Sequence, residues 1–260
     1  MKETMRKMIR KTMAMFVVVC VTVVGFSGIT TKAAVNKALR VSYSFNGQSY
    51  EKDGEKCGFN NNYTIGMPGT SKKVALSKLK MSCDIYVPKK ALKKKQAVVN
   101  VNVFLDLLDG KGEYIAGLPG RVFITAVNEN GKIQLYSWDG VKEKAVKASK
   151  YVTCKAGTGK YKSFYVISLK NLAFSNKMYK EVDGKEVTVG VKSNTKYAFN
   201  VGINVCGENN KGSGKLYIDN VKVVSGSKKI TNINFSKKVD YWGSVKEKDI
   251  TKKKMAIVKL

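Results

Sequence analysis

Histidine is absent from the 260 residues, and only 3 of them are proline. Without histidine the chain cannot build a Ser-His-Asp or Cys-His triad, a His-ligated zinc site or an imidazole general base. Arginine is scarce as well, because Lys supplies 44 of the 48 basic residues behind the net charge of +29. Guanidinium groups are the usual bidentate readers of bases and phosphates. These absences exclude histidine-based hydrolases and argue against a nucleic-acid partner.

Apolar residues make up 43% of the chain and aromatic residues 10%, which is enough to bury a core and argues against wholesale disorder. The length favours one large domain with extensions over two full domains. No window of twelve or more residues shows a convincing helical stripe, whereas apolar and polar residues alternate in many short segments. The sequence therefore predicts an all-β protein.

The first 33 residues have the pattern of a secretory signal peptide: a basic head, the apolar run Met13–Ile29, and small residues at Thr31 and Ala33. We predict cleavage after Ala33 or one residue later. An uncleaved anchor is the alternative, although the run falls short of the roughly 20 residues of a spanning helix. The prediction is a secreted protein, either free or associated with the cell surface, with no membrane segment after cleavage.

Residues 1–33 carry six basic groups and one acidic group, so the mature chain keeps a net charge of +24. This charge could hold an anionic polymer by long-range attraction, or it could be an ordinary solvated surface. Four cysteines remain after cleavage, and they could form two disulfides or stay as buried free thiols. No pair of them is spaced to clamp a metal. These are Cys57, Cys83, Cys154 and Cys206.

Alternation predicts many short strands separated by turns rich in Gly and Asn, as in an antiparallel β-sandwich or jelly roll. Asn130-Gly131 predicts a hairpin turn, and 108–120 and 138–160 are interpreted as long loops. Residues 34–225 would form the sandwich, and 226–260 an extension that adds strands to it. The predicted strands are Leu39–Phe45, Val74–Leu79, Met81–Val87, Val98–Leu107, Arg121–Asn128, Ile133–Trp138, Tyr161–Leu169, Glu186–Val191, Tyr197–Val205 and Leu216–Val224.

Three predicted strands carry amides, a carboxylate and aromatic rings on the face opposite their apolar face. Amides and carboxylates donate and accept hydrogen bonds with sugar hydroxyls, and aromatic faces pack on the apolar side of a pyranose. The alternative is that the amides face turns and that Trp138 covers the edge of the core. The candidate carbohydrate-binding residues are Asn100, Asn102 and Asp106 on one strand, Gln134, Tyr136 and Trp138 on a second, and Asn200 and Asn204 on a third.

Two segments resemble jelly-roll carbohydrate-binding modules of the kind attached to bacterial β-mannanases and β-glucanases. Met81–Pro88 (MSCDIYVP) is similar to one strand of those modules, and Tyr197–Val223, with its YIDNV ending, is similar to their last strands. Val41–Asn46 (VSYSFN) is weakly similar to their first strand. The resemblance implies a structural Ca²⁺ with Asp219 as a ligand and Asn46 at the position of the usual acidic ligand.

These observations predict a secreted, monomeric, non-catalytic module that binds a neutral β-linked polysaccharide, mannan or glucan. One alternative is a Lys-rich adhesion or structural module that holds an anionic wall polymer. The other is a jelly-roll glycoside hydrolase, which needs two carboxylates about 5–10 Å apart. No acidic pair in the sequence stands in a recognisable catalytic context. The acidic residues considered for such a pair are Asp106, Asp109, Glu113 and Glu129.

Overall fold

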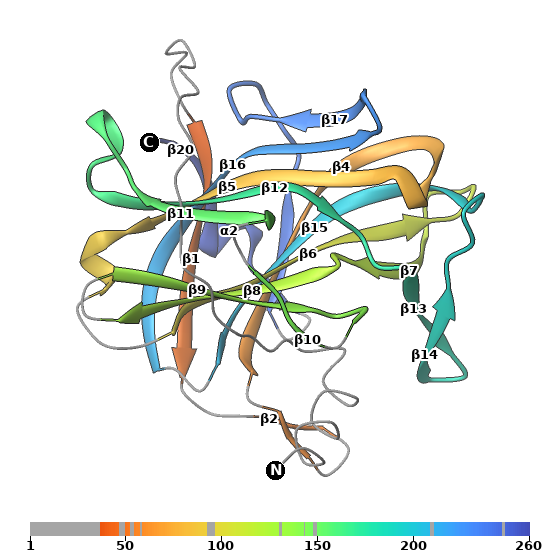
Figure 1. Ribbon diagram of the computed structural model, residues 1–260, viewed down its shortest axis with the longest axis horizontal. Coiled ribbons are helices and arrows are strands. Elements are labelled where there is room, and N and C mark those ends of the chain that lie inside the picture. Colours follow the sequence, from red (N-terminus) through yellow and green to blue (C-terminus); the bar gives the residue numbers. More distant parts are fainter. Residues whose placement is uncertain are drawn as a thin grey trace.

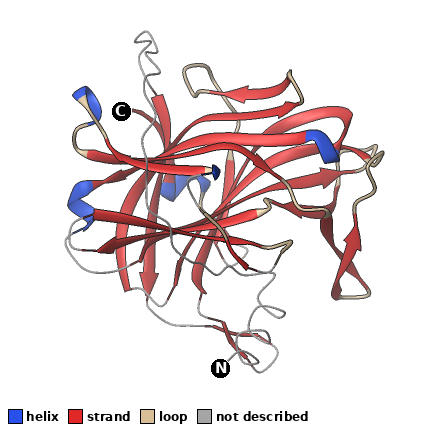
Figure 2. Cartoon of the chain, in the orientation of Figure 1, coloured by secondary structure: helices blue, strands red, loops and turns tan. Residues whose placement is uncertain are grey.

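The computed structural model describes residues 37–46, 50–52, 55–57, 59–92, 97–129, 132–142, 144–147, 150–208, 211–245 and 248–260. The predicted signal peptide and the Asn130-Gly131 turn lie outside these residues. The described chain is almost entirely strand (Figure 2), and all of its strand pairs are antiparallel. No helix in this part of the chain is long and apolar enough to cross a membrane.

Two sheets lie one on the other (Figure 1). The smaller sheet has the order β11–β12–β5–β16–β1–β20, with β17 paired to β16. Its strands are β1 (Lys37–Asn46), β5 (Leu79–Pro88), β11 (Val152–Ala156), β12 (Phe164–Ala173), β16 (Lys211–Ser225), β17 (Lys228–Ile233) and β20 (Met255–Lys259).

The larger sheet has the order β10–β9–β8–β6–β15–β4–β18–β19, and β7, β13 and β14 branch from β6. The β13–β14 hairpin projects from the body of the molecule (Figure 1). The strands are β4 (Phe59–Ala75), β6 (Ala97–Leu108), β7 (Tyr114–Pro119), β8 (Val122–Glu129), β9 (Lys132–Asp139), β10 (Lys144–Ala145), β13 (Lys177–Val182), β14 (Lys185–Gly190), β15 (Lys196–Glu208), β18 (Trp242–Val245) and β19 (Lys248–Asp249).

Short elements complete the described chain. The strands β2 and β3 form a separate small hairpin, and the helical turns are a single turn or little more. Their bounds are β2 (Tyr50–Lys52), β3 (Glu55–Cys57), η1 (Leu76–Lys78), η2 (Lys89–Leu92), η4 (Gly159–Tyr161) and α2 (Thr251–Lys254). The C-terminal strands join both layers, since β20 pairs with β1 and β18 pairs with β4.

The core lies between the sheets and is made by the apolar residues of the alternating strands. In β6 these are Val101, Val103, Leu105 and Leu107, all buried. They meet the inward residues of β5 and β16, such as Ile85 and Ile218, in one continuous apolar cluster. Strands that bury one face and leave the other outside need this period of two.

Three predictions about secondary structure need correction. Val74–Leu79 is not a strand: β4 ends at Ala75, η1 follows, and Leu79 begins β5. The predicted loop 108–120 contains β7, and the predicted loop 138–160 contains β10 and β11. These strands are too short, or too rich in Gly and Lys, for alternation to detect, and they form because a neighbouring strand supplies their hydrogen bonds.

Candidate functional site

The polar residues of β6 and β15 share the outer face of the larger sheet, the face turned away from the core. Their register places Asp106 opposite Asn200, and Asn102 opposite Asn204. Between these two pairs Phe104 lies opposite Gly202. The strand β9 belongs to the same sheet but is separated from β6 by β8. The face predicted by alternation is therefore continuous across these strands.

One cross-strand row on this face consists of Phe104, Gly202, Gly66 and Trp242, on β6, β15, β4 and β18 in turn. We call this row the platform. A Cβ atom added to Gly202 would lie 2.0 Å from Cζ of Phe104, the tip of its ring. One added to Gly66 would lie 2.0 Å from a carbon of the Trp242 indole. Both rings therefore lean over a neighbouring strand, in space that any other residue would fill.

The platform offers aromatic surface to solvent. Trp242 is 39% exposed and Phe104 is half-buried. Both rings are partly covered, and the exposed part of the Trp242 indole is surface on which an apolar ligand could pack. The four strands of the row span three strand spacings, roughly 14 Å, which is the scale of a short oligosaccharide.

Two amide oxygens beside the platform have no hydrogen-bond partner within the described residues. They are the Oδ1 atoms of Asn102 and Asn204, and both are buried. Asn102 as a whole is only 6% exposed. Buried acceptors are normally satisfied by protein or ordered water, and these two oxygens are covered as closely as the Trp138 ring.

The other side of the platform carries a carboxyl group and two phenols. Asp106 pairs with Gly117 of β7, and Gly117 pairs with Tyr179 of β13. The Tyr114 hydroxyl lies 3.5 Å from the position that a Cβ of Gly117 would take, so it stands between Asp106 and Tyr179. The hydroxyl of Tyr179 is buried and has no hydrogen-bond partner in the described part of the chain.

Burial and neighbouring carboxylates change the acidity of this group. Burial raises the pKa of Asp106 to about 6. Burial, with a smaller contribution from Glu186, raises the pKa of Tyr179 to about 12. The pKa of Tyr114 is raised by burial and then by Asp106, Glu186 and Glu181. The Tyr114 hydroxyl therefore lies within electrostatic reach of all three carboxylates.

Part of the predicted site is not accessible. Trp138 is 9% exposed and Asn100 is 1% exposed, so the expectation that Trp138 offers a stacking ring is corrected. Trp138 pairs with Phe123 of β8, which is also buried, and the Thr125 hydroxyl donates a hydrogen bond to Oδ1 of Asn100. Tyr136 and Gln134 share the outer face of β9 and are half-buried, two strands away from β6.

The predicted calcium ligands do not lie together. Leu39 of β1 pairs with Ile218, whereas Asn46 pairs with Lys211, so Asn46 and the neighbourhood of Asp219 are separated by seven residue steps, roughly 23 Å along the strand. Asp219 instead faces Asp84 of β5. Both oxygens of Asp84 accept hydrogen bonds, from Ser168 at 2.5 Å and from Asn220 at 2.8 Å. Asn46 and Asp219 thus cannot bind the same ion.

The remaining metal and thiol candidates are few. No group of three or more Cys, Asp or Glu side chains suited to a metal occurs among the described residues. Cys83 and Cys154 are free thiols, and burial raises the pKa of Cys154 to about 12. The side chains of Cys57 and Cys206 lie outside the description.

The candidate residues from the sequence included no member of the platform, which is Phe104, Gly202, Gly66 and Trp242, and neither Tyr114 nor Tyr179. Alternation does not single out Trp242, because its strand, β18, has only four residues. A usable signal was present in Gly202, since a glycine within a long alternating strand indicates a close approach by another group. Comparison with protein-family models, with curated proteins and with solved structures finds no match to this chain.

Proposed function

We propose that the protein is an exported, monomeric, non-catalytic module that binds a neutral β-linked polysaccharide, mannan or glucan, across the outer face of the larger sheet. The observation that carries the proposal is the platform, with two rings leaning over adjacent glycines and Trp242 exposed to solvent. The resemblance of Met81–Pro88 and Tyr197–Val223 to jelly-roll carbohydrate-binding modules supports the same class.

The mechanism follows from the residues beside the rings. A pyranose packs its C–H side on Phe104 and Trp242, a contact dominated by buried area and dispersion. Its hydroxyls donate to the half-buried Asp106 carboxylate. Displaced water offsets most of each hydrogen bond, so affinity in the μM to mM range is expected.

Trp242→Ala tests the proposal by affinity electrophoresis in gels that contain mannan, mixed-linkage glucan or cellulose derivatives. Removing the ring should lower the affinity at least tenfold, about 1.4 kcal/mol. Trp242→Phe is the matched control, because it keeps an aromatic ring and should retain most of the binding. Migration of Trp242→Ala equal to that of the wild type in every gel, or no retardation of the wild type in any, would overturn the proposal.

A second candidate, hydrolysis of the bound chain, is favoured by one observation: Asp106, with its raised pKa, stands beside the platform and near Glu181 and Glu186. A buried carboxylic acid could protonate a glycosidic oxygen while a second carboxylate activates water. Release of reducing ends by the wild type but not by Asp106→Asn would establish this candidate. The binding proposal predicts no release by either protein.

A further inference from the structure

The outer face of the smaller sheet differs in chemistry from the platform face. One cross-strand row runs from Lys155 on β11 through Val166, Tyr86 and Tyr217 to Arg40 on β1. These five strands span four spacings, roughly 19 Å. The residues between them along each strand point into the core, as the burial of Ile85 and Ile218 shows. The row therefore belongs to the outer face.

The η4 turn is fixed over this face by aromatic packing. The ring of Tyr161 lies 5.2 Å from that of Tyr86, centroid to centroid. Phe164 packs edge-on against Tyr217 at 5.5 Å and against Tyr86 at 6.1 Å. Since these rings fill the surface between the strands, they hold the turn in place. The lysines on either side of Tyr161 are thereby held at this end of the sheet.

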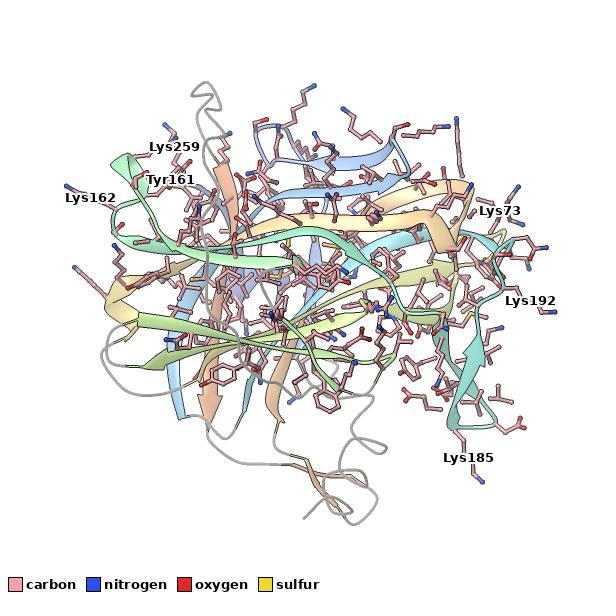
Figure 3. The ribbon with its side chains drawn as sticks, in the orientation of Figure 1. Lys73, Tyr161, Lys162, Lys185, Lys192 and Lys259 are labelled. Atoms are coloured by element: carbon pink, nitrogen blue, oxygen red, sulfur yellow. The ribbon has the colours of Figure 1, made fainter. Side chains whose placement is uncertain are left out.

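Cationic groups surround this aromatic cluster. The ammonium of Lys160 lies 5.0 Å from the centroid of the Tyr161 ring, and Lys162 extends into solvent at the same end of the molecule (Figure 3). The four lysines of this face are exposed. We call the following set the cationic face: Arg40, Lys155, Lys160, Lys162 and Lys215.

Two acidic residues, Asp84 and Asp219, lie next to the cationic face, and the raised pKa of Asp219 reduces the negative charge that this residue adds there. Asp219 is fully buried and faces Asp84. Burial, and then the charge of Asp84, raise the pKa of Asp219 to about 7, although a hydrogen bond from the backbone of Asn220 and the charge of Lys160 oppose the shift. At neutral pH this carboxyl carries about half a charge.

Arg40 supplies a donor that the fold leaves unused. Its Nε atom is buried and has no hydrogen-bond partner among the residues that the structure describes. A buried unpaired donor is costly, and a guanidinium prefers planar anionic groups such as carboxylate or phosphate. The unused donor faces the same side of the sheet as the lysines.

We propose that the cationic face binds a linear acidic glycan, whose anionic groups meet the lysines of β11, η4 and β16 and the guanidinium of Arg40. The site is distinct from the platform, because the two lie on opposite outer faces of the sandwich. The protein would then hold a neutral polysaccharide on one side and a polyanion on the other. Attraction through several exposed charges weakens steeply with salt, whereas ring stacking does not.

The test compares two triple variants with the same loss of charge. One, K160Q/K162Q/K215Q, removes lysines of the cationic face. The other, K73Q/K185Q/K192Q, removes three exposed lysines at the opposite end of the molecule, where Lys73, Lys185 and Lys192 are seen (Figure 3). Binding to heparin and to polygalacturonate is measured at 0.1 M salt and as elution from the immobilised polymers. Both polymers carry carboxylates and only heparin carries sulfates, so stronger binding to heparin would indicate that sulfate contributes to recognition.

The cationic-face variant should bind at least one of the two polymers about tenfold more weakly than the wild type, and the control variant less than threefold more weakly. Arg40→Lys keeps the charge but loses the Nε donor, and should weaken binding about threefold. Equal losses in the two triple variants, or no binding of either polymer, would overturn the proposal. So would tighter binding of single-stranded DNA than of both glycans. Thermal melting of each variant verifies that the fold is intact.

Discussion

The two outer faces of the sandwich use aromatic residues in opposite ways. On the larger sheet, Phe104 and Trp242 lean over Gly202 and Gly66, and an indole remains exposed. On the smaller sheet, Tyr86, Phe164 and Tyr217 meet one another edge to face, at 83° in both pairs that involve Phe164. There the rings fill the surface and leave it to lysines. What lies beside an aromatic residue, glycine or another ring, decides whether the ring becomes a ligand surface or packing.

The two outer faces also differ in the charged residues that lie on them. The platform has Asp106 beside it, with Glu181 and Glu186 near by, and the cationic face has Lys155, Lys160 and Lys215. The chain has a net charge of +29, and the acids beside the cationic face, Asp84 and Asp219, face each other. This difference supports the proposals of a neutral ligand on the first face and a polyanion on the second.

The largest effect should separate the two tryptophans. Trp138→Ala removes a buried ring and should lower the free energy of unfolding by about 3–5 kcal/mol, whereas Trp242→Ala removes a partly exposed ring and should cost far less. Chemical denaturation of the two variants measures the difference. Equal stability losses would mean that the exposure of the two rings is misassigned, and with it the position of the platform.

The second effect concerns Asp219 and the pH dependence of stability. The folded protein raises its pKa from 3.8 to about 7, so it holds the proton more tightly than the unfolded chain does. Ionising Asp219 therefore costs the folded protein stability. This cost is small near pH 4, grows as the pH rises, and is complete above pH 7. Asp219→Asn should therefore raise the free energy of unfolding at pH 8, by an amount of the order of 2–4 kcal/mol, and have little effect at pH 4.

Asp183→Asn is the matched control for this comparison, since Asp183 lies exposed in the turn between β13 and β14. Its φ of 53° is one that Asn adopts readily. The variant loses the same charge without touching a buried site. If Asp183→Asn and Asp219→Asn changed the pH profile alike, net charge and not burial would be the cause.

The sequence predicted this comparison only in part. Period two identified the faces of β6 and β15, because strands that bury one side must alternate. It could not show that Trp138 is buried while Trp242 is exposed, since both are large aromatic residues on polar faces of strands. That distinction depends on what covers each strand in space. The separation of Asn46 from Asp219 was equally hidden, because it is set by the register of β1 against β16.

The third effect tests whether binding requires a glycine beneath the Phe104 ring. Gly202→Ala places a Cβ where the Phe104 ring tip lies, so the ring must lift or turn away from β15. Binding of the neutral polysaccharide should fall about tenfold, with binding of a polyanion unchanged. Gly110→Ala, at a position with nothing within 4 Å, is the control. A wild-type affinity in Gly202→Ala would show that the ring position is irrelevant to binding.

The smallest effect is an opposite response of the two faces to pH: a lower pH should weaken ligand binding at the platform and strengthen it at the cationic face. Lowering the pH from 7.5 to 5 protonates Asp106, whose pKa is about 6. The loss of a charged acceptor for sugar hydroxyls should weaken neutral-polysaccharide binding two- to threefold, roughly 0.5 kcal/mol. The same change protonates Asp219, removes its negative charge beside Lys160, and should strengthen polyanion binding slightly. Asp106→Asn should flatten only the first profile, measured by isothermal titration. If both ligands instead responded to pH in the same direction, or if Asp106→Asn kept the wild-type profile, the assignment of Asp106 to the platform ligand would be wrong.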